Sequence, residues 1–398
     1  MRDFPVAKVT EKAERSAKAG HPWVYSEEVI SVSGEYKSGD IVDVTSVKGK
    51  YLGSGFINDN SKIRIRIISR NANDRFDTPF WERRVKYALN YRRTVMPGDD
   101  FRCCRLIFGE ADTFPGLTVD RFENVLVTEV LCLGIEQRKS VIYNALLSQL
   151  PEITAVYERN DSDIRLLEGM EKHCGFYYGD GGGTVTIKEN GILYNVDYVN
   201  GQKTGFFLDQ KYNRAAVARI ASGKNVLDCF THTGAFALNA AKGGAARVTA
   251  LDISQKAVED AKSNAKLNGL DDKIDFVCAD VFEYLTKMYN ENDRRYDFII
   301  LDPPAFTKSR STVKDAMRGY KEINLKAMRL LPRGGYLATC SCSHFMRDSL
   351  FCQMLHDAAS DAGVSLLQIE ARQQSPDHPI LWNVPETDYL KFYIFEVI

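Results

Sequence analysis

The carboxyl-terminal half of the chain alternates short apolar runs with longer stretches of helical periodicity. The apolar runs include NVLDCF, RVTALD, DFVCAD and YDFIIL, and the helical stretches between them include SQKAVEDAKSNAKLNG and YKEINLKAMRLLP. Short apolar runs separated by helices are typical of right-handed β-α-β units. The pattern therefore predicts an α/β fold with a doubly wound, Rossmann-like parallel sheet. Two final runs, SLLQIEARQ and LKFYIFEVI, predict two further strands, one of them antiparallel.

The first 184 residues have a different pattern, in which strand-like runs are more frequent. Residues 1–70 combine runs rich in Val, Ile and Tyr with turn signals such as SGEYKSGD, which predicts a small β-rich domain. Residues 71–184 mix helical stretches with strand-like runs and end in the glycine-rich loop YGDGGGT, which predicts a central α+β domain. Residues 185–398, which open on the hairpin-like segment VTIKENGILYNVDY, form the third predicted domain.

One strand-like run, KIRIRI at 62–67, carries cations at every second position. Lys62, Arg64 and Arg66 alternate with three isoleucines, and a period of two places the cations on one face and the isoleucines toward the core. Such a face is either a solvated side of the sheet or a ridge that contacts phosphates. These three cations are the candidate RNA-binding residues.

Length and composition exclude several classes of protein. At 398 residues, with 44% hydrophobic and 26% charged residues, the chain has the composition of a soluble globular protein of two or three domains. No apolar run approaches the ~20 residues that cross a bilayer, and the charged N-terminus lacks the apolar segment of a secretory signal. We therefore expect a cytoplasmic protein without a membrane partner. A net charge of −1 leaves any RNA contact to local patches.

The nine cysteines show no Cys-x-x-Cys pair and no regular spacing. This pattern is typical neither of a disulfide framework nor of a zinc site, and the histidines also lack the spacing of metal ligands. We expect no metal and mostly reduced, buried cysteines.

Carboxylates follow one another at the ends of the apolar runs in the carboxyl-terminal domain. Asp228, Asp252 and Asp280 close three runs, and Asp302 follows a fourth. Polar groups at the carboxyl ends of parallel strands build the ligand sites of open sheets. A single aspartate at a strand end is often only a helix N-cap, whereas the ordered set predicts one pocket.

The turn after the first of these runs, DCFTHTGA at 228–235, indicates which cofactor the pocket takes. It lacks the G-x-G-x-x-G spacing of dinucleotide sites, and the chain has no P-loop motif. S-adenosylmethionine, with its ammonium, sulfonium and ribose diol, suits acidic partners instead. We expect Asp252 to accept the ribose hydroxyls, Asp280 with Val281 to bind the adenine amino group, and Gly234 to let the loop pass close to the methionine moiety.

Two further motifs concern the methyl acceptor. Asp302 opens DPPAF, a rigid loop that also occurs in amino-group methyltransferases and therefore does not select the base. Cys342, in ATCSCSH, suits covalent addition to C6 of a pyrimidine, which makes C5 nucleophilic. The competing interpretation of Cys342 is a buried structural cysteine.

Segments along essentially the whole chain together resemble one family, the bacterial RlmI-type large-subunit (23S) rRNA cytosine-5 methyltransferases. GHPWVYSEEV and GDIVDVTSVKGKYLGSGFINDNSKIRIRI resemble the PUA domain of that family. NGQKTGFFLDQKYNR, VLDCFTHTGAFALNAAKGGA, LDPPAFTKS, SCSH, PDHPI and ETDYLKFYIFEV resemble the rest. The resemblance implies an RNA-binding PUA domain at 1–70, a central domain at 71–184 and a class I methyltransferase domain at 185–398. It also implies rRNA as the partner and suggests a homodimer.

The resemblance further implies roles for individual residues. Cys342 has the position of the family's nucleophile, and Asp302 is the second candidate catalytic residue. Other RNA cytosine-5 methyltransferases commonly carry a product-release cysteine in the Asp302 loop, where this chain has Pro304 and Ala305. The release base is therefore open between Asp302 and an ordered water. The candidate residues for binding S-adenosylmethionine are Gln210, Asp228, Phe230, Thr231, Gly234, Asp252, Ile253, Asp280, Val281 and Asp302.

The function expected from these features is S-adenosylmethionine-dependent methylation of C5 of a cytosine in large-subunit rRNA through a covalent cysteine adduct. Two alternatives remain. One is an rRNA guanine methyltransferase that uses the Asp302 loop without a covalent step. The other is a non-catalytic RNA-binding assembly factor that retains a vestigial pocket.

Overall fold

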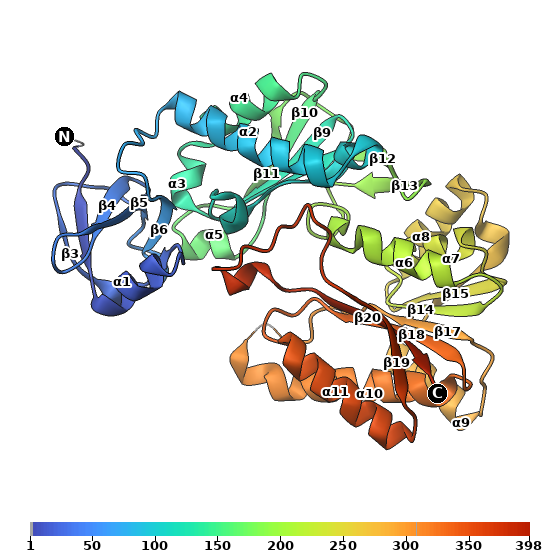
Figure 1. The fold of residues 1–398 in the computed structure, drawn as a ribbon. Helices are drawn as coiled ribbons and strands as arrows, with labels where there is room; N and C mark the ends of the chain where they lie inside the picture. Colours follow the sequence, from blue (N-terminus) through green and yellow to red (C-terminus); the bar gives the residue numbers. More distant parts are fainter. Residues whose placement is uncertain (1–2, 308) are drawn as a thin grey trace. The chain divides into compact units, whose positions relative to one another are not determined.

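The computed structural model describes residues 3–307 and 309–398 (Figure 1). The chain divides into two compact units, and each unit is assembled from several segments. Among the described residues, the first unit contains 3–187, 195–208 and 376–387, and the second contains 188–194, 209–307, 309–375 and 388–398. The chain therefore passes between the units more than once, and the short segment 376–387 belongs to the first unit although it lies near the carboxyl terminus.

The first unit begins with the small β-rich domain that the sequence predicts. Its six-stranded sheet has the order β2-β6-β5-β4-β1-β3, and helix α1 (Glu11–Lys18) packs its buried alanines into the core of this domain. Only β1 and β4 are parallel. The strands are β1 (Val6–Val9), β2 (Trp23–Val24), β3 (Val29–Ser33), β4 (Ile41–Thr45), β5 (Tyr51–Ile57) and β6 (Ile65–Ser69).

The KIRIRI segment differs from its predicted form. Strand β6 begins only at Ile65, lies between β2 and β5, and is buried at every position. Arg66 is 9% exposed and forms ion pairs with Glu168 at 3.0 Å and Glu110 at 3.3 Å. The prediction of a cationic face open to solvent or phosphate is therefore wrong for Arg66, because carboxylates of the central region cover it, whereas Lys62 is exposed and Arg64 partly exposed. The RNA-binding role of the three cations remains a prediction.

The central region forms a five-stranded sheet of order β11-β10-β9-β8-β7, in which only β9 and β10 are parallel. Helices α2 (Thr78–Val95) and α4 (Lys139–Gln149) pack against each other beside it, while α3 (Leu133–Glu136) and α5 (Ile164–Leu167) are single turns (Figure 1). The strands are β7 (Cys103–Phe108), β8 (Leu117–Phe122), β9 (Val125–Val130), β10 (Ala155–Asn160) and β11 (His173–Tyr178). The predicted α+β alternation is confirmed.

The predicted hairpin follows as β12 (Thr184–Glu189) and β13 (Ile192–Asp197). The seven-stranded sheet of the second unit then has the order β16-β15-β14-β17-β18-β20-β19. Its first five strands are parallel, and β20 runs antiparallel between β18 and β19, as the two final apolar runs predict. The strands are β14 (Asn225–Cys229), β15 (Arg247–Asp252), β16 (Ile274–Cys278), β17 (Phe298–Leu301), β18 (Gly335–Ser341), β19 (Leu366–Arg372) and β20 (Lys391–Val397).

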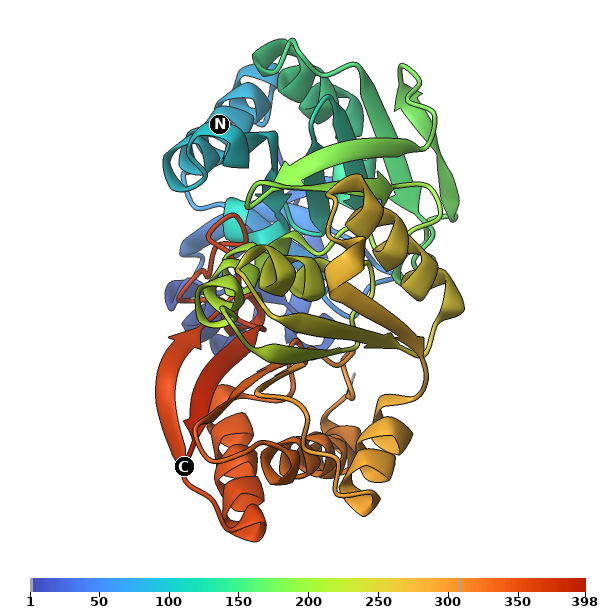
Figure 2. The same ribbon diagram turned by 90° about the vertical axis from the view of Figure 1, so that its right-hand side faces the viewer.

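Helices cover both faces of this sheet, which confirms the doubly wound fold. One layer contains α6 (Lys211–Ile220), α7 (Ala235–Lys242) and α8 (Gln255–Leu267). The other contains α9 (Val281–Asn290), α10 (Val313–Leu330) and α11 (Asp348–Ala362), and the two layers lie on opposite sides of the strands in both views (Figures 1 and 2).

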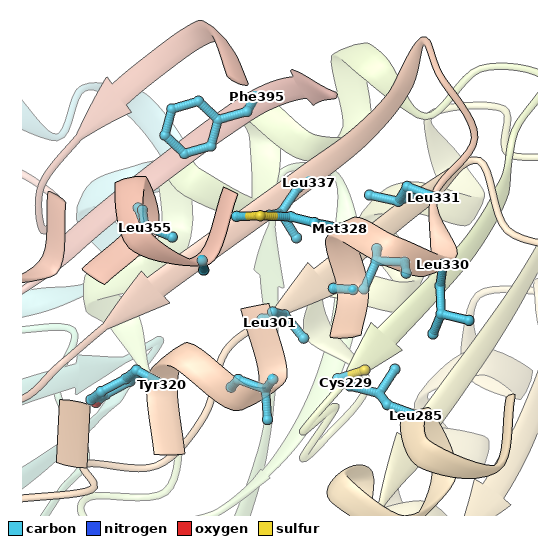
Figure 3. Packing of buried hydrophobic residues seen from close by; sticks show 14 of the residues in the cluster. Cys229, Leu285, Leu301, Tyr320, Met328, Leu330, Leu331, Leu337, Leu355 and Phe395 are labelled. Carbon is cyan, nitrogen blue, oxygen red and sulfur yellow. The ribbon is translucent and has the colours of Figure 1, made fainter. Parts of the chain in front are cut away.

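A single apolar cluster joins the sheet to the second helix layer. Figure 3 shows Leu301 and Leu337 from the strands packed among Tyr320, Met328 and Leu355 from the helices. All five side chains are at most 3% exposed. Burial at this density holds the strand ends in fixed positions, which is what a site built from several strands requires. None of the helices in the described part of the chain combines the length and apolar character needed to cross a bilayer.

Candidate active site

The carboxyl ends of the parallel strands bring the predicted site residues to one edge of the sheet. Cys229, the last residue of β14, pairs with Leu251 on β15 and with Leu301 on β17, and Leu301 pairs with Thr339 on β18. The residues that follow these positions therefore leave the sheet at the same level. They include Asp252, Asp302 and Cys342, and Asp228 lies one residue before Cys229 within β14.

Asp228 lies at the end of β14 and is fully buried. One carboxylate oxygen, Oδ2, accepts hydrogen bonds from the Thr231 hydroxyl at 2.5 Å and from the Ala237 N–H at 2.9 Å. The other oxygen, Oδ1, has no hydrogen-bond partner among residues 3–307 and 309–398. Burial raises the pKa of Asp228 to about 7. Asp228 thus anchors the turn to α7 and leaves one oxygen that a ligand or water can use.

The turn that follows β14 has an unusual backbone. Phe230, His232 and Gly234 have φ angles of 63°, 50° and 80°, which lie in the left-handed region. For the two non-glycine residues, Phe230 and His232, such conformations cost free energy and persist only where the surroundings impose them. A Cβ on Gly234 would lie 2.9 Å from the Cβ of Ala261, so only glycine fits at this position. The turn is held close to α8 and presents its backbone at the sheet edge.

Asp252 ends β15, and its carboxylate has a fixed orientation. Its two oxygens accept hydrogen bonds from the N–H groups of His232 and Ser254, both at 2.9 Å. The next residue, Ile253, has a large apolar side chain that is 67% exposed. A carboxylate beside an exposed aliphatic side chain suits a nucleoside, because the ribose diol donates hydrogen bonds and the base has an apolar face.

Asp280 and Val281 have less direct access to a ligand. The Asp280 carboxylate caps α9 by accepting a hydrogen bond from the Glu283 N–H at 3.0 Å. Val281 is 2% exposed and belongs to the apolar cluster. Only its backbone could meet an adenine. Asp280 thus serves as a helix N-cap, which is the simpler role of an aspartate at a strand end. Its second carboxylate oxygen remains for the predicted contact with the adenine amino group.

Asp302 forms a buried polar group with Gln210 and Cys340. Its Oδ1 accepts hydrogen bonds from Gln210 Nε2 at 3.1 Å and from the Cys340 thiol at 2.9 Å. The Gln210 amide is oriented by Asn213, which donates to its Oε1 at 2.6 Å. Removal from water raises the pKa of Asp302 to about 6. Asp302 is therefore ionised at neutral pH and more basic than an ordinary aspartate.

Cys342 comes directly after β18 and is partly exposed, whereas Cys340 within the strand is buried. Its two neighbours, Ser341 and Ser343, both form hydrogen bonds with the Tyr320 hydroxyl, at 2.9 and 3.0 Å. The backbone on both sides of the thiol is thus fixed to α10. None of the nine cysteines, all of which lie in the described residues, forms a disulfide.

Sequence reasoning did not identify three residues of this edge, namely Cys340, Tyr320 and Lys391. Lys391 is 5% exposed, and its ammonium donates 2.8 Å hydrogen bonds to the carbonyl oxygens of Ser343 and Tyr389. The signal for Lys391 was a charged residue near the start of LKFYIFEV, a run that is otherwise apolar up to Glu396. Cys340 and Tyr320 had no such signal, because a buried cysteine in an apolar strand and a buried tyrosine in an amphipathic helix are both ordinary.

The side chains at this edge fit S-adenosylmethionine. The polar groups at this edge are carboxylates and an amide, which suit the ammonium, sulfonium and hydroxyl groups of the cofactor better than a phosphate. Asp228 has a buried oxygen without a hydrogen-bond partner among the described residues. Ile253 exposes an apolar surface beside Asp252. Asp228, Asp252 and Gln210 would hold the polar groups of the cofactor. No cationic side chain or glycine-rich phosphate cradle lines the described turn at 228–235.

Comparison with known proteins agrees with this fit. A model of the S-adenosylmethionine-dependent methyltransferase family matches residues 106–395, and a PUA-like domain model matches residues 7–70. The chain belongs to the S-adenosylmethionine-dependent methyltransferase family. Its cofactor is S-adenosylmethionine. The predicted fold class, a class I Rossmann-like methyltransferase with an N-terminal PUA-like domain, is confirmed.

Relatives with similar full-length sequences are named ribosomal RNA large subunit methyltransferase I. The protein of Pseudoalteromonas translucida is 41% identical over 96% of this chain and 97% of its own. The protein of Shewanella frigidimarina is 42% identical with the same coverage, and that of Klebsiella pneumoniae is 39% identical over 99% of both chains. The family resemblance seen in the sequence is confirmed.

Two solved structures share the fold along nearly the whole chain. One is a putative S-adenosylmethionine-dependent methyltransferase from Streptococcus mutans, with a TM-score of 0.83 and 23% identity over 98% of this chain and 99% of its own. The other is a putative methyltransferase in complex with SAH, with a TM-score of 0.84 and 22% identity at the same coverage.

Proposed function

We propose that this protein methylates C5 of a cytosine in the RNA of the large ribosomal subunit, through a temporary covalent bond between Cys342 and C6. The observation that carries the proposal is the partly exposed Cys342 thiol at the strand edge that also holds Asp302. The relatives named ribosomal RNA large subunit methyltransferase I support rRNA as the substrate class. An rRNA substrate also supports a cytoplasmic location, which we include in the proposal.

The chemistry requires the thiolate because C5 of a cytosine is a weak nucleophile. The lone pair of Cys342 Sγ forms a bond to C6, the C5–C6 π electrons move toward C4 and N3, and N3 takes up a proton. C5 then carries the electron density of an enamine. S-adenosylmethionine, when bound, would supply an electrophilic methyl group: the C5–CH3 bond would form as the S–CH3 bond breaks, and the electron pair of the broken bond would stay on the sulfur of S-adenosylhomocysteine. Removal of the C5 proton and breakage of the S–C6 bond return the thiolate, and N3 returns its proton.

Asp302 is our candidate for the base that removes the C5 proton. Its pKa of about 6 leaves it ionised at neutral pH, while its basicity exceeds that of an exposed aspartate. Gln210 and Cys340 hold the Asp302 carboxylate through Oδ1, which leaves Oδ2 as the oxygen proposed to accept the proton. Gln210, Asp228, Phe230, Thr231, Gly234, Asp252, Ile253, Asp280 and Val281 are proposed to line the cofactor pocket.

RNA binding is proposed for the N-terminal domain at 1–70, which matches a PUA-like model over 7–70. Of the three predicted cations, Lys62 is exposed, Arg64 pairs with Asp59 at 2.8 Å, and Arg66 is buried in its pair with Glu168. Phosphate contact therefore fits Lys62 best, and Arg64 next. The division of the remaining chain into domains at 71–184 and 185–398, and the homodimer, also remain proposals.

The test uses large-subunit rRNA transcripts labelled with tritium at C5 of cytosine. Methylation at C5 releases the label into water, whereas methylation of a guanine does not. We expect tritium release with the wild-type protein, a loss of at least about 10³-fold in Cys342→Ala, and near-wild-type release in Cys352→Ala, which removes an exposed cysteine on α11. Full activity in Cys342→Ala would refute the covalent mechanism.

The same assay separates the alternatives. Methyl incorporation without tritium release would favour guanine as the acceptor. Absence of cofactor binding by calorimetry, even at millimolar S-adenosylmethionine, would favour a non-catalytic assembly factor.

A further inference from the structure

Lys391 is a buried lysine at the strand edge that carries Cys342. It is the first residue of β20 and is 5% exposed, between Leu390 and Phe392, which are both fully buried. Lysine is rarely buried to this extent unless its charge has a partner. The groups around its ammonium therefore indicate what compensates the buried charge.

Strand register and hydrogen bonds place the Lys391 ammonium beside Cys342. Lys391 pairs with Ser341 across the β18–β20 ladder, so its backbone faces the residue before Cys342. Its Nζ donates a 2.8 Å hydrogen bond to the carbonyl oxygen of Ser343, the residue after Cys342. Lys391 therefore contacts both neighbours of Cys342, Ser341 through the strand pairing and Ser343 through the ammonium.

The carbonyl contacts do not neutralise the ammonium. They occupy two of its three N–H donors, at Ser343 and Tyr389. Within residues 3–307 and 309–398, no carboxylate lies within ion-pair distance of Nζ. Two carboxylates act on it from farther away, and each has its own donor: Asp348 accepts from the Tyr393 hydroxyl at 2.6 Å, and Asp388 accepts from Gln373 Nε2 at 3.2 Å.

We infer that the Lys391 ammonium is a positioning residue that stabilises the thiolate form of Cys342 for addition to C6. The inference rests on the proposed nucleophilic role of Cys342. A cation beside a thiol favours the thiolate, and a thiolate beside a buried ammonium compensates its charge. The third N–H donor is available for this contact.

The electrostatics of the lysine agree with this geometry. Burial lowers the pKa of Lys391 to about 8, and the groups that oppose the shift are Cys342, Asp388, Asp348 and Cys340, with Cys342 first. The attraction between an ammonium and a thiolate is mutual, so the contact that favours the charged lysine also favours the charged form of the thiol.

The experiment measures the alkylation rate of Cys342 by iodoacetamide from pH 5 to 10, followed by peptide mass mapping of the full-length protein. In Lys391→Met we expect the midpoint of the rate profile to rise by about one pH unit, so that alkylation at pH 7 is about tenfold slower. Lys391→Arg, which keeps the charge, should stay within about threefold of wild type. Lys326→Met, on α10 and 20% exposed, is the matched control and should leave the profile unchanged.

Each result has a definite meaning. Calorimetric binding of S-adenosylhomocysteine and thermal melting identify variants that keep the fold. An unchanged alkylation profile in folded Lys391→Met or in Lys391→Gln would overturn the inference, while loss of tritium release in Cys342→Ala would still support the covalent mechanism. Conversely, full activity in Cys342→Ala with a shifted alkylation profile would refute the nucleophilic role and leave the coupling between lysine and thiol intact. If neither Lys391→Met nor Lys391→Gln folds, the test rests on Lys391→Arg. A pH midpoint of Cys342 alkylation well below that of an ordinary cysteine in this variant supports the inference, and a midpoint near that of an ordinary cysteine overturns it.

Discussion

At the scale of single residues, the candidate site combines carboxyls of very different environments. Asp228 is fully enclosed, Asp302 shares a buried hydrogen-bonded group with Gln210 and Cys340, and Asp280 caps a helix at the surface. The first two have a raised pKa because burial disfavours their charged forms. Each of them leads to a prediction about pH.

Asp302→Asn tests the proposed base. If an ionised Asp302 is needed, wild-type tritium release falls about tenfold for each pH unit below about 6, where the carboxyl becomes protonated. The variant should lose about 10²-fold or more of the activity at pH 7.5 and should lack this acidic limb. An acidic limb that persists in the variant would assign it to another group.

Asp228→Asn tests the effect of burial on stability. The folded-state pKa of Asp228, about 7, lies above the ordinary aspartate pKa of 3.8. The contribution of Asp228 to the free energy of unfolding is therefore most favourable below about pH 4 and is lost as the pH rises from about 4 to 7. The asparagine variant has no such loss. Its melting temperature, measured without cofactor, should therefore rise relative to wild type as the pH increases from 4 to 8. A constant difference across this range would contradict the raised pKa.

At the scale of elements, the turn between β14 and α7 depends on the absence of a side chain at Gly234. Gly234→Ala adds a Cβ that lies 2.9 Å from Ala261, at a φ of 80°. Gly223 is the matched control, because it has a φ of 71° and a Cβ added there would meet nothing within 4 Å. Gly223→Ala therefore carries only the conformational cost of about 1 kcal/mol.

We expect Gly234→Ala to lose about 1–3 kcal/mol more than Gly223→Ala in denaturant unfolding, because the Cβ displaces the turn from α8. S-adenosylhomocysteine binding should weaken only in Gly234→Ala. Equal losses in both variants would show that the packing against Ala261 is not important.

Strand β6 gives a second prediction at this scale. Arg66→Met leaves Glu168 buried without its cation, which should cost about 3–5 kcal/mol of folding free energy. Lys62→Ala should leave unfolding unchanged and should reduce RNA affinity uniformly across sequences, with a weaker dependence on salt. Filter binding at several salt concentrations, with melting curves for both variants, separates a structural arginine from an RNA-contacting lysine.

At the scale of the whole molecule, the first unit contains two later segments of the chain, residues 195–208 and 376–387, besides its amino-terminal part. Thr204 donates to the buried Asp120 at 2.5 Å, and Arg159 donates to the carbonyl oxygens of Tyr198 and Gly201. Arg92, which is fully buried, donates to the carbonyl oxygen of Asp377. The later segments thus satisfy buried polar groups of the earlier ones.

This arrangement predicts that residues 1–187 do not form a stable fragment. Without residues 195–208, Asp120 and Arg159 lose buried partners, so the fragment should melt less cooperatively and at a lower temperature than a fragment of residues 1–208. Circular dichroism melting of both fragments checks this. Identical cooperative melting would show that the segment 195–208 adds nothing to the unit.

The sequence alone determined the alternation of strands and helices, the doubly wound sheet and the order of the acids along it. These follow from periodicity and from the rule that polar strand ends of a parallel sheet share one edge, both of which are local properties. It also singled out Cys342, because a cysteine at such a strand end has a chemical use.

Only the tertiary structure decided which charged groups are buried and what they contact. Arg66 lost its predicted solvent face because Glu110 and Glu168, distant in sequence, fold over it. Lys391 reaches the carbonyl oxygen of Ser343, the residue after Cys342, only because β20 inserts antiparallel beside β18. Burial and pairing depend on contacts between remote segments, and no local pattern of hydrophobic and polar residues encodes them.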